Sequence, residues 1–400
     1  MKLPVYLDYN ATTPCDPRVV DAMMPFFTET FGNAASRHHY YGWQAEAAVE
    51  KAREQVAQLI NAEPREIVFT SGATEAANLA IKGVFESYRA KGAHIITTNV
   101  EHKAVLDTCK YLERKGAEVT YLPVDKNGLI SAEQVQQAVR PSTILISVMF
   151  ANNETGVIMP VKEIGAIAKQ HSVLFFSDAT QAVGKVPVDV QASGIDLLAM
   201  SAHKFYGPKG MGALYVRRRN PRVAIAAQIH GGGHERGFRS GTLNVPSIIG
   251  LGQACELAMR EMVNDAERLI FLRNKMQREL LEIENSFVNG STEHRLPNVC
   301  NVGFHYIDGD ALMSGLKKDI AISSGSACTS ASIEPSYVLK AMGLSDEMAH
   351  GSLRFSLGRF TTEEEINFAV ERLKMKIHEL RESNPVWQMY KQGVNFNEIE

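Results

Sequence analysis

The sequence has 400 residues, 45% of them hydrophobic, and a formal net charge of −3 at pH 7. This length suits two fused domains, and the charge gives no reason to expect direct binding to nucleic acid or to anionic membranes. No run approaches the ~18 uncharged apolar residues that a membrane span needs, and the N-terminus lacks the apolar core of a secretory signal. The five cysteines are scattered without a CxxC pair, which favours a reducing compartment, most simply the cytoplasm.

The first two thirds of the chain alternate short, almost fully apolar segments with helical patterns. Such segments are typical of strands in a largely parallel sheet that helices cover on both faces. A tight basic run, residues 217–219, ends another apparent strand and is expected to be a solvated edge. The sequence predicts an α/β fold with strands at 67–70, 94–98, 143–150, 173–176 and 195–200.

A different pattern begins near residue 256 and indicates a smaller α+β domain. A long helix is expected through residues 268–280, and two threonines before Glu363 resemble an N-cap followed by an acidic first turn. The boundary between the two domains is placed near residue 258. The later elements of this domain are strands at 298–304 and 352–357 and a helix over 363–380.

Polar residues follow the carboxyl ends of five predicted strands. Ligands of open α/β sheets bind outside these ends, so the polar side chains are expected to converge. A cap or loop role is the commoner explanation for each residue alone, and their recurrence is what indicates a site. The residues are Thr74, His102, Asn153, Asp178, Gln181, Ser201, His203 and Lys204.

Three of these positions suit a pyridoxal cofactor. Asp178 directly follows a buried strand and could pair with a protonated pyridine nitrogen, although capping the next helix is an equal alternative. Lys204 follows a Ser-x-His strand end and could form a Schiff base, whereas most lysines lie on the surface. The segment 71–74 opens a helix and could bind a phosphate or simply cap that helix.

Two further residues could act on a substrate. His102 is a candidate general acid or base, or a ring stacked on the cofactor, and the alternative is a structural histidine at a helix N-terminus. Arg354 should lie on the strand face opposite Leu353 and Phe355. Its guanidinium suits a substrate carboxylate, and an intramolecular ion pair is a close competitor.

Cys328 lies in a run of small residues, 323–330. Such a segment is expected to pack poorly and to be mobile, so that its thiol could react at one place and deliver at another. The remaining cysteines lie in apolar contexts or near the N-terminal loop, which favours small core residues. They are Cys15, Cys109, Cys255 and Cys300.

Taken together, the chain resembles the pyridoxal-phosphate cysteine desulfurases of the NifS/IscS type along essentially its whole length. The serine-rich cysteine segment and residues 389–393 resemble the housekeeping iron–sulfur branch, and Ala202 stands where the family usually has glycine. The matching segments are residues 6–14, 69–75, 101–103, 152–154, 178–181, 203–204, 230–237, 239–242, 323–330 and 354–359.

This resemblance implies a fold-type-I homodimer with a mostly parallel seven-stranded sheet. The large domain would span residues 14–258, and residues 1–13 and 259–400 would form the small domain with the cysteine segment. The implied reaction converts L-cysteine to L-alanine and leaves a persulfide on Cys328. Implied acceptors are an iron–sulfur scaffold and a carrier for transfer-RNA thiolation.

The resemblance also implies a role for each site residue. Lys204 would hold the cofactor as a Schiff base, with Asp178 at its ring nitrogen and Gln181 at its phenolic oxygen. Asn153 and Arg354 would orient the substrate carboxylate. His102 would stack on the ring and move protons, and Cys328 would attack the substrate sulfur. The implied phosphate ligands are Ala73, Thr74, Ser201, His203 and Thr242 of the partner subunit.

Alternatives remain at this point. A selenocysteine lyase or an aminotransferase of the same fold would share the cofactor residues, and a non-enzymatic sulfur carrier would need none of them.

The glycine-rich segment 230–237 and Thr242 are predicted to lack a partner in their own chain. The stretch after Pro385, with Trp387 and Met389, is predicted to bind partner proteins, unless it packs on the small domain.

Overall fold

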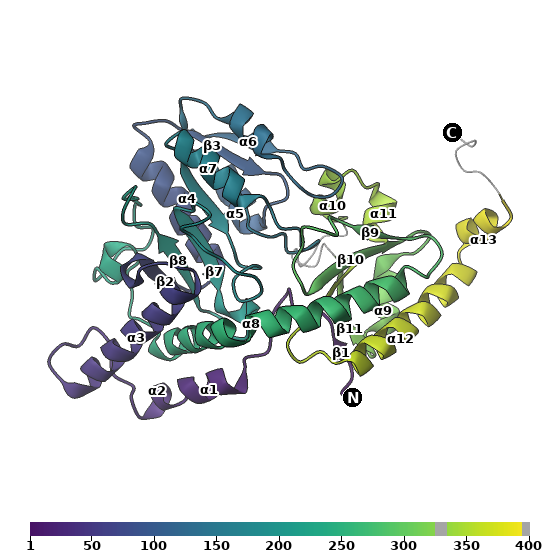
Figure 1. Cartoon of the computed structure of the whole chain (residues 1–400), viewed down its shortest axis with the longest axis horizontal. Coiled ribbons are helices and arrows are strands. Elements are labelled where there is room, and N and C mark those ends of the chain that lie inside the picture. Colours follow the sequence, from purple (N-terminus) through teal and green to yellow (C-terminus); the bar gives the residue numbers. More distant parts are fainter. Residues whose placement is uncertain (325–333, 394–400) are drawn as a thin grey trace.

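The computed structural model describes residues 1–324 and 334–393 (Figure 1). Its largest sheet has seven strands in the order β2-β8-β7-β6-β5-β3-β4. Only β8 runs antiparallel to its neighbours, so the predicted mostly parallel sheet is confirmed. The strands are β2 Ile67–Thr70, β3 His94–Thr98, β4 Glu118–Leu122, β5 Thr143–Ser147, β6 Leu174–Asp178, β7 Leu197–Ser201 and β8 Gly212–Val216.

Helices cover both faces of this sheet because successive strand residues point to opposite sides. Ile96 and Phe175 face one apolar cluster, and their neighbours Ile95 and Phe176 face another. The helices α3, α6 and α7 pack on the first face, and α4 and α5 pack on the second. Their bounds are α3 Tyr40–Leu59, α4 Ala73–Tyr88, α5 Lys103–Glu113, α6 Ala132–Ala138 and α7 Val161–Gln170.

A single long helix, α8, connects the two parts of the molecule. It spans Val245–Leu280, 36 residues, which corresponds to about 54 Å at the usual rise per residue. Leu251 packs in the core of the large sheet, and Leu272 packs in a separate cluster with the small sheet. The predicted boundary near residue 258 therefore falls inside a continuous helix, which Figure 1 shows running along both parts.

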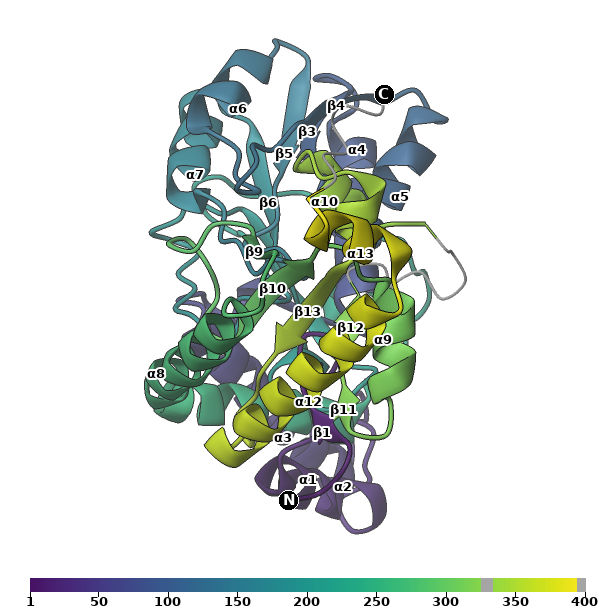
Figure 2. The ribbon, with the colours of Figure 1, turned by 90° about the vertical axis from the view of Figure 1, so that its right-hand side faces the viewer.

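The second part contains a four-stranded antiparallel sheet in the order β12-β13-β10-β9. Helices α9 and α12 pack on it, and Figure 2 shows them in front of the strands. The N-terminal strand β1 pairs here in parallel with β11, more than 300 residues later. The elements are β1 Val5–Tyr6, β9 Ser286–Asn289, β10 Val299–Phe304, α9 Gly309–Leu316, β11 Ile320–Ala321, β12 Ser323–Ser324, β13 Ser352–Ser356 and α12 Glu363–Glu382.

Short helices complete the described chain. Thr362 caps α12 and exchanges hydrogen bonds with Glu365, which confirms the predicted N-cap. No helix within residues 1–324 and 334–393 is both long and apolar enough to span a membrane. The short helices are α1 Pro17–Met23, α2 Pro25–Thr28, α10 Tyr337–Ala341, α11 Asp346–His350 and α13 Pro385–Lys391, with 3-10 turns at Pro64–Glu66, Ala202–Lys204 and Glu235–Gly237.

The expected solvated basic edge at residues 217–219 holds for Arg219, which is exposed, but not for Arg217. Arg217 is buried, and its guanidinium lies 3.0 Å from the carboxylate of Asp196. A buried charge requires a partner, and sequence alone does not reveal that Asp196, at the start of β7, provides it.

The glycine-rich segment, predicted to lack a partner in its own chain, and the C-terminal stretch, predicted to bind partner proteins, both make internal contacts. In the glycine-rich segment, the carboxylate of Glu235 is buried 2.8 Å from the Arg53 guanidinium and also accepts the Phe69 N–H. In α13, Trp387 is buried against Tyr306 and lies under the Arg381 guanidinium. The alternative that the C-terminal stretch packs on the small domain therefore holds for Trp387.

Candidate active site

A cavity of about 550 Å³ opens at the carboxyl ends of the parallel strands. The strand-end rule placed the site here, because parallel strands bring their carboxyl ends to one edge. Ten of the twelve residues predicted for the site line this cavity. They are Ala73, Thr74, His102, Asn153, Asp178, Gln181, Ser201, His203, Lys204 and Arg354.

Lys204 closes the short 3-10 turn that follows β7. Its ammonium nitrogen donates to the backbone carbonyls of Asn10 and Ala11, each at 2.7 Å. The next residue of that N-terminal segment, Thr12, contacts His203 through its hydroxyl at 3.0 Å. Lys204 is thus a cavity residue held by the N-terminal segment, in contrast to a surface lysine.

Asp178 ends β6 and is buried beside the cavity. One carboxylate oxygen accepts the Thr180 N–H at 3.0 Å, which closes a tight turn. The alternative that Asp178 caps a following helix is not what the structure has, because residues 179–185 form turns. A buried carboxylate at the cavity wall is suited to a cationic group of a ligand.

His102 has the structural role considered as an alternative, and it also lines the cavity. It is the N-cap of α5, where its Nδ1 accepts the Ala104 N–H at 3.1 Å. Burial lowers the pKa of His102, although the nearby Asp178 acts in the opposite direction. A neutral ring with Nδ1 as acceptor carries its proton on Nε2, so His102 can offer one defined N–H at the cavity.

The start of α4 is suited to an anion. Gly72 precedes the helix with φ of 154°, a conformation that favours glycine, and no side chain caps the helix there. The free N–H groups of the first turn and the helix dipole attract phosphate. Ser201 and His203 line the same cavity, and burial lowers the pKa of His203 to about 4.

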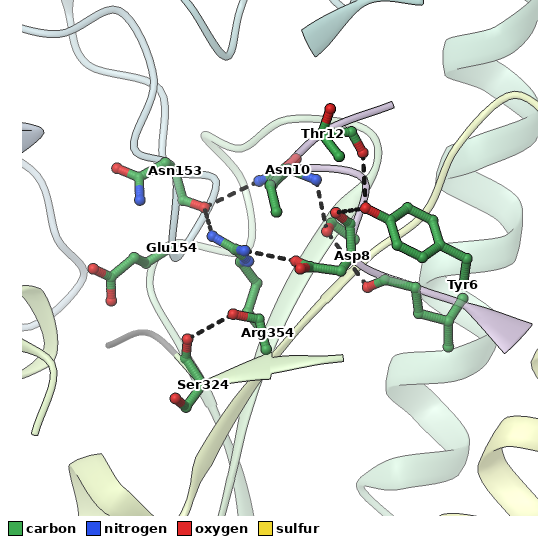
Figure 3. A network of polar contacts seen from close by, with 12 residues as sticks. Tyr6, Asp8, Asn10, Thr12, Asn153, Glu154, Ser324 and Arg354 are labelled. Carbon is green, nitrogen blue, oxygen red and sulfur yellow. Dashed lines mark hydrogen bonds and ion pairs between the residues drawn. The ribbon is translucent and has the colours of Figure 1, made fainter. Parts of the chain in front are cut away.

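Arg354 combines both alternatives considered for it from sequence (Figure 3). Its guanidinium forms an ion pair with Asp8 at 2.7 Å and donates to the Asn153 backbone carbonyl at 2.9 Å, while the side chain lines the cavity. Its Nε and the Asn153 Oδ1 are buried without a hydrogen-bond partner among the described residues. Such buried polar atoms at a cavity indicate that a polar ligand completes the site.

The sequence reasoning missed two residues that organise this wall of the cavity. Asn10 accepts from Lys204 and from Gln181 Nε2 through its backbone carbonyl. Lys185 donates to Gln181 Oε1 at 2.6 Å. The segment 6–14 carried part of the family resemblance, so it offered a signal for Asn10, but no role was assigned to it.

Of the two other predicted site residues, one borders another pocket and the other is not among the described residues. Thr242 is exposed and borders a separate small pocket with Ser71 and Gly210. Cys328 lies outside the described residues. Three of the other cysteines are buried, as predicted, and burial raises the pKa of Cys109 to about 12 and that of Cys300 to about 11.

Comparison with known proteins decides the family. The class-V aminotransferase family matches residues 5–368. Proteins described as "Cysteine desulfurase IscS" from Escherichia coli and from Shigella boydii are each 57% identical over 402 residues, covering 100% of this chain and 99% of theirs. The chain belongs to the IscS-type cysteine desulfurases. It is an enzyme of a family that uses pyridoxal phosphate, and the lysine, the carboxylate and the helix N-terminus around the cavity fit this cofactor.

Solved structures support the same assignment. A "NIFS-LIKE PROTEIN" superposes with a TM-score of 0.88 at 40% identity, covering 94% of this chain and 100% of its own. A structure described as "SspA in complex with cysteine" gives 0.78 at 40% identity, covering 90% and 100%. The predicted fold class of the enzyme is therefore confirmed.

Proposed function

We propose that the enzyme converts L-cysteine to L-alanine and carries the sulfur as a persulfide on Cys328. One arrangement carries this proposal: Lys204, Asp178 and Arg354 line one cavity, and β12 pairs with β13 at Arg354. The next residues of the chain lead to Cys328. The desulfurase relatives and the cysteine-bound structural relative support the same substrate.

The cofactor residues take the roles that the resemblance implies. Lys204 would hold pyridoxal phosphate, Asp178 would pair with its ring nitrogen and Gln181 would donate to its phenolic oxygen. Bound pyridoxal phosphate supplies an electron sink for the substrate carbon. The phosphate is bound by the start of α4, Ser201 and His203.

Three groups of the site orient the substrate, move its protons and attack its sulfur. Arg354 and Asn153 bind the cysteine carboxylate through the guanidinium and the amide N–H groups, and both residues line the cavity. His102 accepts and returns protons through Nε2. Cys328 attacks as the thiolate, since that is the competent nucleophile.

The sulfur transfer balances without an added oxidant or reductant. The Cys328 sulfur bonds to the substrate sulfur as the carbon–sulfur bond breaks, and the electron pair of that bond passes to the substrate carbon. A proton then completes alanine. A thiol and cysteine therefore become a persulfide and alanine with all atoms accounted for.

The test uses the purified enzyme with L-cysteine. Cys328→Ser should keep the fold and the bound cofactor but form neither persulfide nor more than traces of alanine, because a hydroxyl cannot form a sulfur–sulfur bond. Cys15→Ser is the control, since Cys15 is a half-buried thiol that is absent from the cavity lining. Full alanine production by Cys328→Ser would instead favour a lyase reaction that breaks the carbon–sulfur bond without this thiol.

We also propose that the enzyme is a homodimer with Thr242 of the partner subunit at each phosphate. One support is that Thr242 is exposed. The other is a group of aromatic side chains on and beside α2 and α3 that are more than half exposed. Subunit interfaces commonly bury such aromatic surface. The aromatic residues are Phe27, Phe31, Tyr40 and Trp43.

The remaining proposals concern domains, acceptors and location. The large domain of residues 14–258 and the small domain of residues 1–13 and 259–400 are supported by their separate apolar clusters. The acceptors are an iron–sulfur scaffold and a sulfur carrier for transfer-RNA thiolation, as the branch resemblance implies. The unpaired cysteines support a cytoplasmic location.

A further inference from the structure

Lys185 is a partly buried residue, and neither the catalytic proposal nor the sequence patterns provide a role for its amine. Its Nζ donates to Gln181 Oε1 at 2.6 Å and to Asn10 Oδ1 at 3.3 Å. Across residues 1–324 and 334–393, no carboxylate lies within ion-pair distance of it. Shielding an amine from water without a counter-charge costs free energy. The two hydrogen bonds of Lys185 offset part of this cost.

Both partners of Lys185 are side-chain amides, whose oxygen and nitrogen ends are interchangeable in shape. The Gln181 Oε1 faces Lys185, and its Nε2 donates to the Asn10 carbonyl at 2.9 Å. The Asn10 Oδ1 faces Lys185 and Asn298, and its Nδ2 donates to the Asn153 carbonyl at 3.1 Å. The donor on Lys185 therefore fits one orientation of each amide and opposes the flipped one.

One of these two residues, Asn10, also contacts Lys204. The Asn10 carbonyl accepts from both Gln181 Nε2 and Lys204 Nζ. Gln181 also lines the cavity, so the second hydrogen on its Nε2 is available to a ligand there. Lys185 is thus linked to Lys204 through Asn10 and to the ligand space through Gln181.

The surroundings of Lys185 favour a neutral amine, which still donates hydrogen bonds, over a permanent positive charge. Burial, then Lys204 and Arg354, lower the pKa of Lys185 well below its ordinary value. The charged or titratable side chains acting on Lys204 and its neighbours are Asp178, His102, His203, Lys185, Lys209 and Arg354.

We propose that Lys185 is a positioning residue: its hydrogen bonds hold the Gln181 amide with N–H, rather than C=O, directed at the cofactor. This inference rests on the proposed role of Gln181 at the phenolic oxygen. An N–H donated to that oxygen stabilises its anionic form, which then holds the proton shared with the Lys204 nitrogen less tightly. Loss of Lys185 removes one of the two contacts that oppose the flipped amide, the other being the Asn10 carbonyl. The N–H orientation is then less populated, and the shared proton is held more tightly.

The test is a spectroscopic pH titration of the cofactor bound to Lys204, with no substrate present. Lys185→Met removes the donor and nearly conserves the chain length, and its titration midpoint should rise by about one pH unit, the size of one lost hydrogen bond. Lys185→Gln keeps an N–H donor without a charge and should remain near wild type. Lys169→Met removes an exposed lysine of α7 and is the control for the loss of any lysine.

Each outcome is decisive. A midpoint shift in Lys185→Met that Lys185→Gln does not share supports the proposal. Equal shifts in both variants would assign the effect to charge, and unchanged midpoints in folded, cofactor-loaded variants would show no positioning role; either result overturns it. If wild type has no titratable cofactor band, the proposed function itself fails, which separates the two cases.

Discussion

At the scale of single residues, the site depends on polar groups buried with few partners. Glu101 is fully buried beside His102, and burial raises the pKa of its carboxyl to about 8. One of its oxygens accepts the Met149 N–H at 2.7 Å, and the other has no partner among the described residues. The folded protein therefore favours the protonated form of Glu101.

This pKa predicts how stability depends on pH. Because the folded pKa is raised, the folded state binds the proton more tightly, so the contribution of Glu101 is full below about pH 4.5 and is lost as pH rises through about 8. Between pH 6 and pH 9, the free energy of unfolding should fall less in Glu101→Gln than in wild type. Urea unfolding at both pH values measures this difference.

A matched control is Glu46→Gln, which changes an exposed glutamate on α3. Its free energy of unfolding should follow that of wild type at both pH values. Equal pH dependence in Glu101→Gln and wild type would show that the Glu101 carboxyl does not titrate differently in the folded state.

Arg354 leads to a second prediction at this scale. Arg354→Lys keeps a positive charge for Asp8 but loses the planar guanidinium that can bind a carboxylate through two N–H groups. The KM for L-cysteine should rise by about tenfold or more, equivalent to one or two charge-assisted hydrogen bonds. Cofactor absorbance should be retained, because the residues proposed to hold the cofactor are unchanged. An unaltered KM would remove Arg354 from the substrate site.

At the scale of elements, α8 packs its apolar side chains into two separate hydrophobic cores. Leu272 is buried in the small-sheet cluster, while its neighbour Phe271 is 59% exposed. Leu272→Ala should lower the free energy of unfolding by about 2–5 kcal/mol, and Phe271→Ala should change it by less than about 1 kcal/mol. Thermal or denaturant unfolding distinguishes the two, and equal losses would contradict this assignment of the helix faces.

The elements also explain what sequence could and could not predict. Short apolar runs followed by polar residues located β2, β3, β5, β6 and β7 and most of the site, because strand ends converge by geometry. The strand expected over residues 143–150 ends at Ser147, although Val148 and Phe150 still donate to backbone carbonyls of β6. Periodicity alone does not specify where the last paired residue lies.

Asn10 and Lys185 were missed for a different reason. Their positions are 175 residues apart in sequence, and their contact exists only after the two parts of the chain have docked. No local pattern marks an asparagine whose carbonyl will meet a lysine 194 residues later. Arg217 shows the same limit, because its apparent exposure in a basic run is reversed by Asp196.

At the scale of the whole molecule, the proposed dimer predicts a mass of twice the chain's 44.1 kDa. Light scattering at low micromolar concentration should give this value. Thr242→Ala should weaken binding of pyridoxal phosphate without changing the mass, because the residue is exposed and lies outside its own chain's cavity. A fully active monomer would contradict both the assembly and the shared site.

The pairing of β1 with β11 has a consequence for how the protein is made. Val5 is synthesised more than 300 residues before its partner Ile320, and Asp8 more than 300 residues before Arg354. A nascent chain can fold most of the large sheet before these partners exist. Asn10, which lies next to this segment and contacts Lys204, is therefore expected to be fixed only after β11 and β13 have been made.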